Sequence, residues 1–338
     1  MPSMPPVSVS EIADGPTKAM IEIVRACNLR CPSCPVGNGL ALRWPAMPFA
    51  LYQEIINVSS RTLKQLSLFN YGEPLLCPEI DRYVDYAKRS GIKRVTIHTN
   101  GLLLSEDMGV RIITAGLDRL TISIDAVDTY AYNQYRLGGD FETLLGNIRQ
   151  FMMSRNRLGK ALPEVEGQFI VMAHNEHQMG KFADLCGELG LDVASIKTYN
   201  ARMDLTHRIK HRELQPVNPI FSRAQGQVDS ANTTRSCQFC SWPRNVLAVN
   251  ADGTIVPCCY DYNNWNPLGS FPGRAQEEWW NTRRRRDFVQ RLEQNPFSVS
   301  LCQKCPKGMI SLSKSTPRSL RGETGGKQSG IDETSKTR

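Results

Sequence analysis

The feature that most constrains the fold is a regular alternation of short apolar runs and longer helical segments between residues 20 and 198. The predicted strands are residues 20–24, 65–70, 94–98, 119–124, 168–172 and 193–198, and the predicted helices are residues 48–58, 78–89, 105–115, 141–155 and 177–189. Strands that alternate with helices form βαβ units and a parallel sheet. Right-handed crossovers place the loops after the strands at one edge, and ligands bind outside those carboxyl ends. The sequence therefore predicts an α/β fold whose functional residues follow its strands.

Three cysteines, Cys27, Cys31 and Cys34, come directly after the first predicted strand. Cysteine thiolates hold iron–sulfur clusters, and thiols in one short loop can converge on a single cluster. Three ligands for a four-iron cluster leave one iron without a protein partner. Such an open metal position is where a small molecule binds and reacts, as at catalytic zinc sites. The motif thus predicts a cluster with an open coordination position.

A thioredoxin-like redox pair is the alternative for part of this motif, because C-x-x-C near a βαβ pattern is typical of that class. Such a pair has no use for Cys27. It usually opens a helix at once, whereas Pro35, Gly37 and Gly39 keep this segment in a loop. The cluster is therefore the favoured interpretation.

The spacing C-x3-C-x2-C after a first strand resembles the radical S-adenosylmethionine (radical SAM) family. The resemblance implies a partial (β/α)6 barrel, smaller than the eight-fold barrel, with Cys27, Cys31 and Cys34 as ligands of a [4Fe–4S] cluster. It also implies that the open iron chelates SAM, which is split to a 5′-deoxyadenosyl radical that takes hydrogen from a substrate. The expected partners are a small-molecule substrate and an electron donor such as flavodoxin or ferredoxin.

Polar residues after the predicted strands extend this resemblance. The stretch that begins at Tyr71 is similar to the family's Gly-Gly-Glu stretch, which implies that Gly72 and Glu73 meet the ammonium group of SAM. Tyr71 itself departs from the pattern, since many members have glycine there. Ser123 and Asp125 share one face of the fourth strand by period-two alternation, and they resemble family groups that bind the ribose or carboxylate of SAM. For Asp125 the alternative is a cap on the following turn.

Six further cysteines, which we call the second cysteine field, are Cys237, Cys240, Cys258, Cys259, Cys302 and Cys305. A hairpin with an Asp252-Gly253 turn is predicted before Cys258, and a helix over residues 276–294 is predicted before Cys302. This order resembles the auxiliary-cluster extension of radical SAM enzymes, called SPASM with two clusters and twitch with one. Too few cysteines remain for two. The resemblance therefore implies one auxiliary [4Fe–4S] cluster, held by Cys240, Cys258, Cys302 and Cys305.

Other ligand sets remain open in the second cysteine field. Zinc bound by Cys237, Cys240, Cys302 and Cys305 is one, although such pairs are usually separated by about 15 to 20 residues. Cys237 or Cys259 replacing one of the four cluster ligands is another. Neighbouring side chains of a strand point to opposite faces, so Cys258 and Cys259 do not both reach one cluster. If Cys258 is the ligand, Cys259 resembles the cysteine that donates hydrogen in radical SAM epimerases; a buried inert thiol is the alternative.

Composition bears on location and partners. No segment approaches the ~18 apolar residues of a membrane span, and the first 17 residues lack the features of a signal peptide, so a cytoplasmic protein is expected. Eleven cysteines in a reducing compartment favour metal ligands or redox thiols over disulfides. The net charge of +8 is compatible with an anionic substrate or partner. It is weak evidence for nucleic acid, and without aromatic-basic interleaving no nucleic acid is expected. Residues 283–286, all arginine, are expected on a solvated surface.

The expected organisation is a flexible leader at 1–19, the barrel at 20–199, a linker at 200–236, a small α+β auxiliary-cluster domain at 237–310 and a disordered tail at 311–338. The leading expectation for function is a radical SAM oxidoreductase or epimerase that acts on a polar small molecule, such as a sugar or aminocyclitol, in a biosynthetic pathway. The first alternative is a SPASM-type maturase of a ribosomally made peptide. The second is a non-enzymatic zinc or redox-thiol protein.

Overall fold

The computed structural model describes residues 14–199, 212–221, 240–273, 276–295, 298–303 and 305. Its centre is a nine-stranded sheet with the order β6-β5-β4-β3-β2-β1-β7-β8-β9. The first six strands are β1 (Lys18–Ile21), β2 (Gln65–Ser67), β3 (Arg94–Thr99), β4 (Arg119–Ser123), β5 (Glu164–Val171) and β6 (Val193–Thr198). Each pairs in parallel with the next one in the sequence. The predicted parallel sheet is confirmed.

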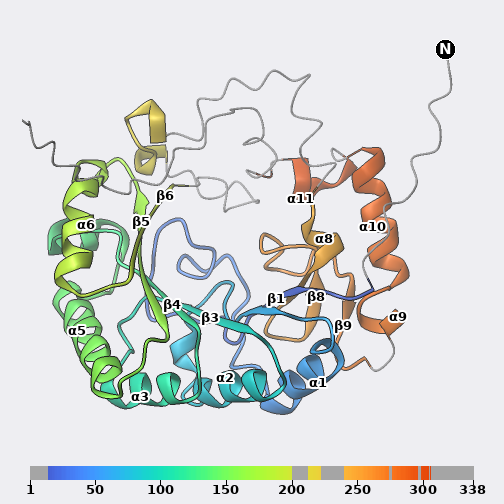
Figure 1. Ribbon diagram of the computed structural model, residues 1–338. Helices are drawn as coiled ribbons and strands as arrows, with labels where there is room; N and C mark the ends of the chain where they lie inside the picture. Colours follow the sequence, from blue (N-terminus) through green and yellow to red (C-terminus); the bar gives the residue numbers. More distant parts are fainter. Residues whose placement is uncertain are drawn as a thin grey trace, which may run out of the picture.

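Helices line the outside of the curved sheet (Figure 1). They are α1 (Phe49–Ser59), α2 (Ile80–Arg89), α3 (Glu106–Thr114), α5 (Phe141–Arg157) and α6 (Met179–Glu188), with short 3-10 turns at η1 (Pro74–Leu76), η2 (Glu176–Gln178), η3 (Arg212–Leu214) and η4 (Pro219–Phe221). Among the described residues the sheet ends at β6 on one side and β9 on the other, so the barrel is partial, as predicted. None of the helices described here is long and apolar enough to span a bilayer.

Side-chain caps set the starts of three helices in the barrel part of the chain. Ser105, Asp128 and Asp140 each accept a backbone N–H from the residue three positions later, at 3.2, 2.8 and 2.6 Å. Such caps satisfy donors that the first turn of a helix leaves without an intrahelical partner. Ser105 begins α3 and Asp140 begins α5, close to the predicted starts. Asp128 begins α4 (Thr129–Tyr135), a helix for which the sequence contains no prediction.

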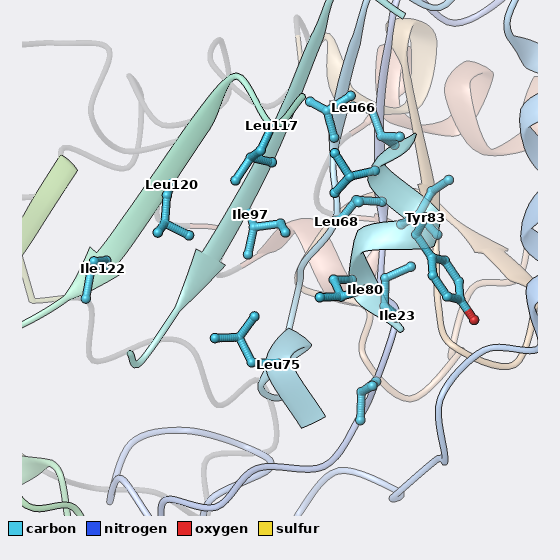
Figure 2. Close-up of a cluster of buried hydrophobic side chains, with 14 of the residues drawn as sticks. Ile23, Leu66, Leu68, Leu75, Ile80, Tyr83, Ile97, Leu117, Leu120 and Ile122 are labelled. Atoms are coloured by element: carbon cyan, nitrogen blue, oxygen red, sulfur yellow. The ribbon is translucent and has the colours of Figure 1, made fainter. Parts of the chain in front are cut away.

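The two faces of the sheet carry different side chains. On the outer face, Ile97 and Leu120 are fully buried and belong to one apolar cluster with side chains of β2 and α2 (Figure 2). At alternate positions, Thr121, Ser123 and Gln168 bring polar groups to the inner face. Period-two alternation thus directs apolar side chains to the helices and polar ones into the barrel. The inner face is where a polar ligand can be bound.

The C-terminal strands continue the same sheet. β7 (Val246–Val249) pairs in parallel with β1, β8 (Thr254–Val256) runs antiparallel to β7, and β9 (Gly269–Ser270) follows. The turn between β7 and β8 contains Gly253 at a φ of +86°, a conformation that glycine adopts without strain. The predicted hairpin is therefore confirmed. Its pairing with β1 joins the second cysteine field directly to the barrel.

The C-terminal helices are α8 (Trp242–Asn245), α9 (Gln276–Trp279), α10 (Arg283–Gln294) and α11 (Ser300–Gln303). The single helix predicted over 276–294 is two helices, because Thr282 is extended and caps α10 by accepting the N–H of Arg285 at 3.0 Å. Arg285 is fully buried, lies 4.0 Å above the ring of Trp280 and donates to the carbonyl of Pro243 at 2.8 Å. The expected solvated surface is thus wrong at this position.

Candidate cofactor and active site

The loop between β1 and α1, which we call the cysteine loop, carries Cys27, Cys31 and Cys34. It lies inside the curve of the sheet (Figure 1). Cys31 is 6% exposed, and the N–H of Cys34 donates to its carbonyl at 3.1 Å to close a turn. Gly37 packs so closely on this turn that a Cβ there would lie 2.7 Å from the Cys31 carbonyl oxygen. The segment is a loop, as its glycines and prolines predict.

Hydrogen-bond donors surround the thiols of this loop. The N–H of Leu29 lies 3.3 Å from Sγ of Cys27, and Nδ2 of Asn100 lies 3.8 Å from the same sulfur. Nη1 of Arg136 lies 3.7 Å from Sγ of Cys31. Burial raises the pKa of Cys27 to about 12 and raises the pKa of the other two thiols as well. The donors act in the opposite direction, because they stabilise the thiolate.

This donor set fits an iron–sulfur cluster better than a single metal ion. Within the described residues, no three His, Cys, Asp or Glu side chains are grouped as ligands of one ion. In a cluster the cysteines bind separate irons, so their thiols do not need to converge on one point. Ligation requires the thiolate form and releases protons. The donors around Cys27 and Cys31 stabilise that negative charge.

The turn after β2 is pressed against the cysteine loop. Gly72 has a φ of +84°, and a Cβ there would lie 2.3 Å from the carbonyl oxygen of Val24. The N–H of Glu73 donates to the carbonyl of Ala26 at 2.8 Å. The carboxylate of Glu73 is buried and accepts the hydroxyl of Thr99 at 2.6 Å and a backbone N–H of the next turn at 2.7 Å. Burial raises the pKa of Glu73, and these donors oppose that effect.

Alanine at Gly72 is expected to destabilise the protein more than alanine at Gly91. Both glycines have a positive φ, but no atom lies within 4 Å of a Cβ at Gly91. Gly91→Ala should cost about 1–2 kcal/mol for the left-handed backbone, and Gly72→Ala roughly 1–3 kcal/mol more for the steric overlap. Urea unfolding of both variants measures the difference. Equal losses would contradict the close approach of Gly72 to the cysteine loop.

Ser123 belongs to a polar chain across the inner face of β3 to β6. Its Oγ lies 2.8 Å from Nε2 of His98, which is also 3.4 Å from Nε2 of Gln168, and Oε1 of Gln168 accepts a hydrogen bond from Lys197. Since the oxygen of Gln168 faces Lys197, its NH2 group faces His98, whose Nε2 is then the acceptor. Burial, with Lys197 and Arg136 nearby, lowers the pKa of His98 to about 3. His98 is therefore a neutral imidazole.

Asp125 joins three parts of the site. It is 1% exposed and has a φ of +60°. Its Oδ2 accepts hydrogen bonds from Nε of Arg136, at 2.8 Å, and from Nη2 of the same guanidinium, while Oδ1 accepts the N–H of Ile170 at 2.6 Å. The cap of the following helix is Asp128 instead. No sequence motif marks Arg136, which lies in a segment without a predicted element.

Four cysteines of the second cysteine field are neighbours. Burial raises the pKa of Cys258 strongly, and the nearby thiols of Cys259, Cys302 and Cys305 add to that effect. The pKa of Cys302 is raised to about 12 by burial, with Cys305 and Cys240 as neighbouring thiols. The thiols of Cys240, Cys258, Cys302 and Cys305 are thus near enough to affect one another electrostatically, and their ligation of an auxiliary cluster stays a prediction. Cys237 lies outside the described residues.

Cys259 packs in a different apolar cluster from Cys258. It packs with Met20, Ala248 and Val256, on the face of β1, β7 and β8 opposite the helices. Cys258 instead packs against the main apolar core. The two neighbours therefore pack in different clusters, although β8 ends at Val256 and they lie in the bend and turn that follow it rather than in the predicted strand.

Two buried residues connect the cysteine loop to the second cysteine field. Glu22 is fully buried and accepts the backbone N–H groups of Tyr71 and Ala251, at 3.3 and 3.1 Å. The ring of Tyr71 packs in a small cluster with Cys34 and Tyr262, and the two ring centroids are 5.3 Å apart. Tyr71, which departs from the Gly-Gly-Glu pattern, packs between the cysteine loop and Tyr262.

Comparison with known proteins matches both parts of the chain. The sequence profile of the Radical SAM superfamily matches residues 21–157, and that of SPASM, an iron–sulfur cluster-binding domain, matches residues 240–306. The first range contains the cysteine loop and strands β2 to β4. The second contains the four grouped cysteines.

Relatives and solved structures agree with these matches. The chain is 25% identical over 274 residues to a probable GTP 3′,8-cyclase of Methanococcus maripaludis, which covers 73% of this chain and 88% of that protein. It is similar in structure to BtrN in complex with AdoMet and 2-DOIA (TM-score 0.54, 18% identity, 86% of this chain and 92% of that one). Streptococcus suis SuiB bound to precursor peptide SuiA is also similar (TM-score 0.60, 16% identity, 87% and 72%). The chain thus belongs to the radical SAM superfamily of enzymes, carries a C-terminal SPASM domain, and has [4Fe–4S] clusters and SAM as its cofactors.

Proposed function

We propose that this enzyme oxidises or epimerises a polar small molecule of the sugar or aminocyclitol type. One observation carries the proposal: Cys259 packs with Met20, Ala248 and Val256, whereas Cys258, like Cys240 and Cys302, packs against the main apolar core. Four grouped thiols suit one closed auxiliary cluster, and a separate thiol on the inner face suits hydrogen donation to a substrate. The fold likeness to BtrN, solved with 2-DOIA, is in keeping with a small-molecule substrate.

In this proposal Cys27, Cys31 and Cys34 would hold the cluster that binds SAM. When bound, the cluster and SAM supply a 5′-deoxyadenosyl radical, which takes a hydrogen atom from a substrate C–H bond. Gly72 and Glu73 border the ammonium end of SAM, since their backbone lies against the cysteine loop.

Ser123 and Asp125 complete the SAM side of the site. Ser123 is the last residue of β4 and forms a hydrogen bond with His98. Asp125 follows the strand and accepts a hydrogen bond from Arg136. Because Ser123 donates to the neutral His98, its hydroxyl oxygen accepts a further hydrogen bond, from a ribose hydroxyl. Asp125 acts on the cofactor from a fixed position, since both of its oxygens already accept hydrogen bonds from the protein.

The oxidation and epimerisation versions differ in what happens to the substrate radical. In oxidation, the radical loses one electron and a proton, and Cys240, Cys258, Cys302 and Cys305 hold an auxiliary cluster as the electron acceptor. In epimerisation, the S–H bond of Cys259 breaks, its hydrogen atom forms the new C–H bond on the opposite face of the carbon, and the thiyl radical left on Cys259 takes up one electron from the electron donor and one proton from solvent. Both versions start from the same abstraction.

Incubation with SAM and dithionite in D2O tests this function on a panel of sugars and aminocyclitols. Release of 5′-deoxyadenosine with a changed sugar supports the proposal. Deuterium at the reacting carbon identifies epimerisation, because the thiol of Cys259 exchanges with solvent; a ketone without deuterium identifies oxidation. Cys259→Ala should abolish deuterium incorporation, and Cys186→Ala, at a buried thiol of α6, is the matched control. Turnover of peptides alone would refute the small-molecule assignment.

The second candidate is a maturase for a ribosomally made peptide. The observation that favours it is the fold likeness to SuiB, which was solved with its precursor peptide and covers 87% of this chain. A peptide arm in the same D2O experiment separates the two candidates. The non-enzymatic zinc or redox-thiol alternative is not retained, because the chain belongs to a superfamily of enzymes with iron–sulfur clusters.

A further inference from the structure

Helix α4 and the residues after it are fastened to the cysteine loop at three points. The hydroxyls of Tyr135 and Ser33 lie 2.8 Å apart. The N–H of Arg30 donates to the carbonyl of Leu137 at 2.9 Å. Between these two contacts, Nη1 of Arg136 reaches Sγ of Cys31 at 3.7 Å. The guanidinium is therefore held next to one particular thiol.

Asp125 fixes the orientation of this guanidinium. It binds Nε and Nη2 of Arg136, which leaves Nη1 directed at Cys31. Asp125 is itself held from both sides: its Oδ1 accepts the N–H of Ile170, and its carbonyl accepts Nδ2 of Asn175 at 2.8 Å. A non-glycine residue at positive φ is strained and persists only where its surroundings over-determine it. The strained backbone of Asp125 thus belongs to the residue that fixes the direction of the Arg136 guanidinium.

A cation that donates a hydrogen bond to a cluster ligand changes the reduction potential. Hydrogen bonds to the sulfurs and the net charge around a cluster are two of the factors that set its potential. One-electron reduction makes the cluster more negative, so a nearby guanidinium stabilises the reduced form more than the oxidised form. Arg136 is only 11% exposed, and in such a position solvent screens the interaction less than at the surface.

We infer that Arg136 raises the reduction potential of the cluster at Cys27, Cys31 and Cys34 through its hydrogen bond to Cys31, and that Asp125 is a positioning residue that acts through Arg136. The inference rests on the proposed ligation by these three cysteines. It gives Asp125 a role that does not require contact with SAM. It also explains why a short helix without a sequence signal is fastened to the cysteine loop.

The test is a potentiometric titration followed by electron paramagnetic resonance, on reconstituted full-length protein without SAM. The signal of the SAM-binding cluster is identified as the one that later addition of SAM perturbs. Arg136→Gln is expected to lower the equilibrium constant for reduction of this cluster about tenfold, or about 59 mV for one electron. Arg136→Lys keeps the charge without the fixed planar geometry and should lower it less. Asp125→Asn should also lower it, since Nη1 is no longer aimed.

Arg155→Gln is the matched control, because Arg155 forms a similar pair with Asp192, which accepts the N–H of Val165 at 2.7 Å. That pair lies outside the cysteine loop, and no change of potential is expected. An unchanged potential in Arg136→Gln and Arg136→Lys, with SAM affinity lost, would overturn the inference and make Arg136 a SAM contact only. Wild-type protein without iron at these cysteines would instead overturn the proposed function.

Discussion

Alanine at Cys27, Cys31 and Cys34 together is expected to lower the iron content from about eight to about four atoms per chain, because one of two [4Fe–4S] clusters is lost. Release of 5′-deoxyadenosine from SAM should stop entirely. The thiols of the cysteine loop lie beside Asn100, which follows β3, and Arg136, which follows α4. SAM cleavage requires the cluster that these thiols are proposed to hold. Iron and sulfide are counted after anaerobic reconstitution, and deoxyadenosine is measured by chromatography.

A variant with alanine at Cys77 and Cys186 is the control for this experiment. Both thiols are 3% exposed and pack in the apolar core, away from the donors that surround the cysteine loop. The control should keep about eight irons and full SAM cleavage. If the triple variant retains all of its iron while the circular dichroism spectrum shows a folded protein, the three cysteines do not hold a cluster.

The parallel strands could be predicted because each presents apolar side chains to the helices. β6 has the predicted bounds, 193–198, and β3 and β4 differ from the prediction by one residue. β5 begins at Glu164, four residues before its predicted start. Its first part escaped prediction because Glu164 and Glu166 face the inner side and pair with Arg119. A strand inside a barrel can carry paired charged side chains, and in the sequence such a charged segment resembles a loop.

Helix α4 and Arg136 could not be predicted for a different reason. The segment Thr129–Tyr135 has only seven residues, too few for a clear helical period. Its stability depends on the Asp128 cap and on the contacts of Tyr135 with the cysteine loop. The contact between Tyr135 and Ser33 joins residues 102 positions apart, and local sequence carries no signal for it. The hydrogen bond from Arg136 to Cys31 is a product of that packing.

The second cysteine field shows the same limit. Its hairpin is encoded locally, by the Asp252-Gly253 turn between two apolar runs. The pairing of β7 with β1, which matches Lys18 with Val246, has no local signal. That pairing nevertheless determines which side of the sheet Cys258 and Cys259 face. Alternation predicted that they differ, and only the assembled sheet shows which of them lies with the other cysteines.

Alanine at Cys258 and alanine at Cys259 are therefore expected to differ in their effects on iron content and melting temperature. Cys258→Ala should lose about four irons per chain, because one of four thiolates of the auxiliary cluster is removed. Since metal binding contributes to folding free energy, the melting temperature of this variant should also fall. Cys259→Ala should keep all of its iron and its melting temperature, while losing hydrogen donation if the enzyme is an epimerase. Iron counting and calorimetry on the two variants measure these differences.

The pair is informative because the two substitutions remove the same atoms from adjacent residues. Effects on reconstitution, handling and thiol number are thus identical, and only the direction of the side chain differs. Cys258 lies near Cys302 and Cys305, whereas Cys259 packs on Met20 and Val256. Iron loss in Cys259→Ala with full iron in Cys258→Ala would contradict this assignment. Cys259 would then be the cluster ligand and could not be the hydrogen donor. Full iron in both would remove the auxiliary cluster from this pair of cysteines, and with it the electron acceptor that the oxidation version requires.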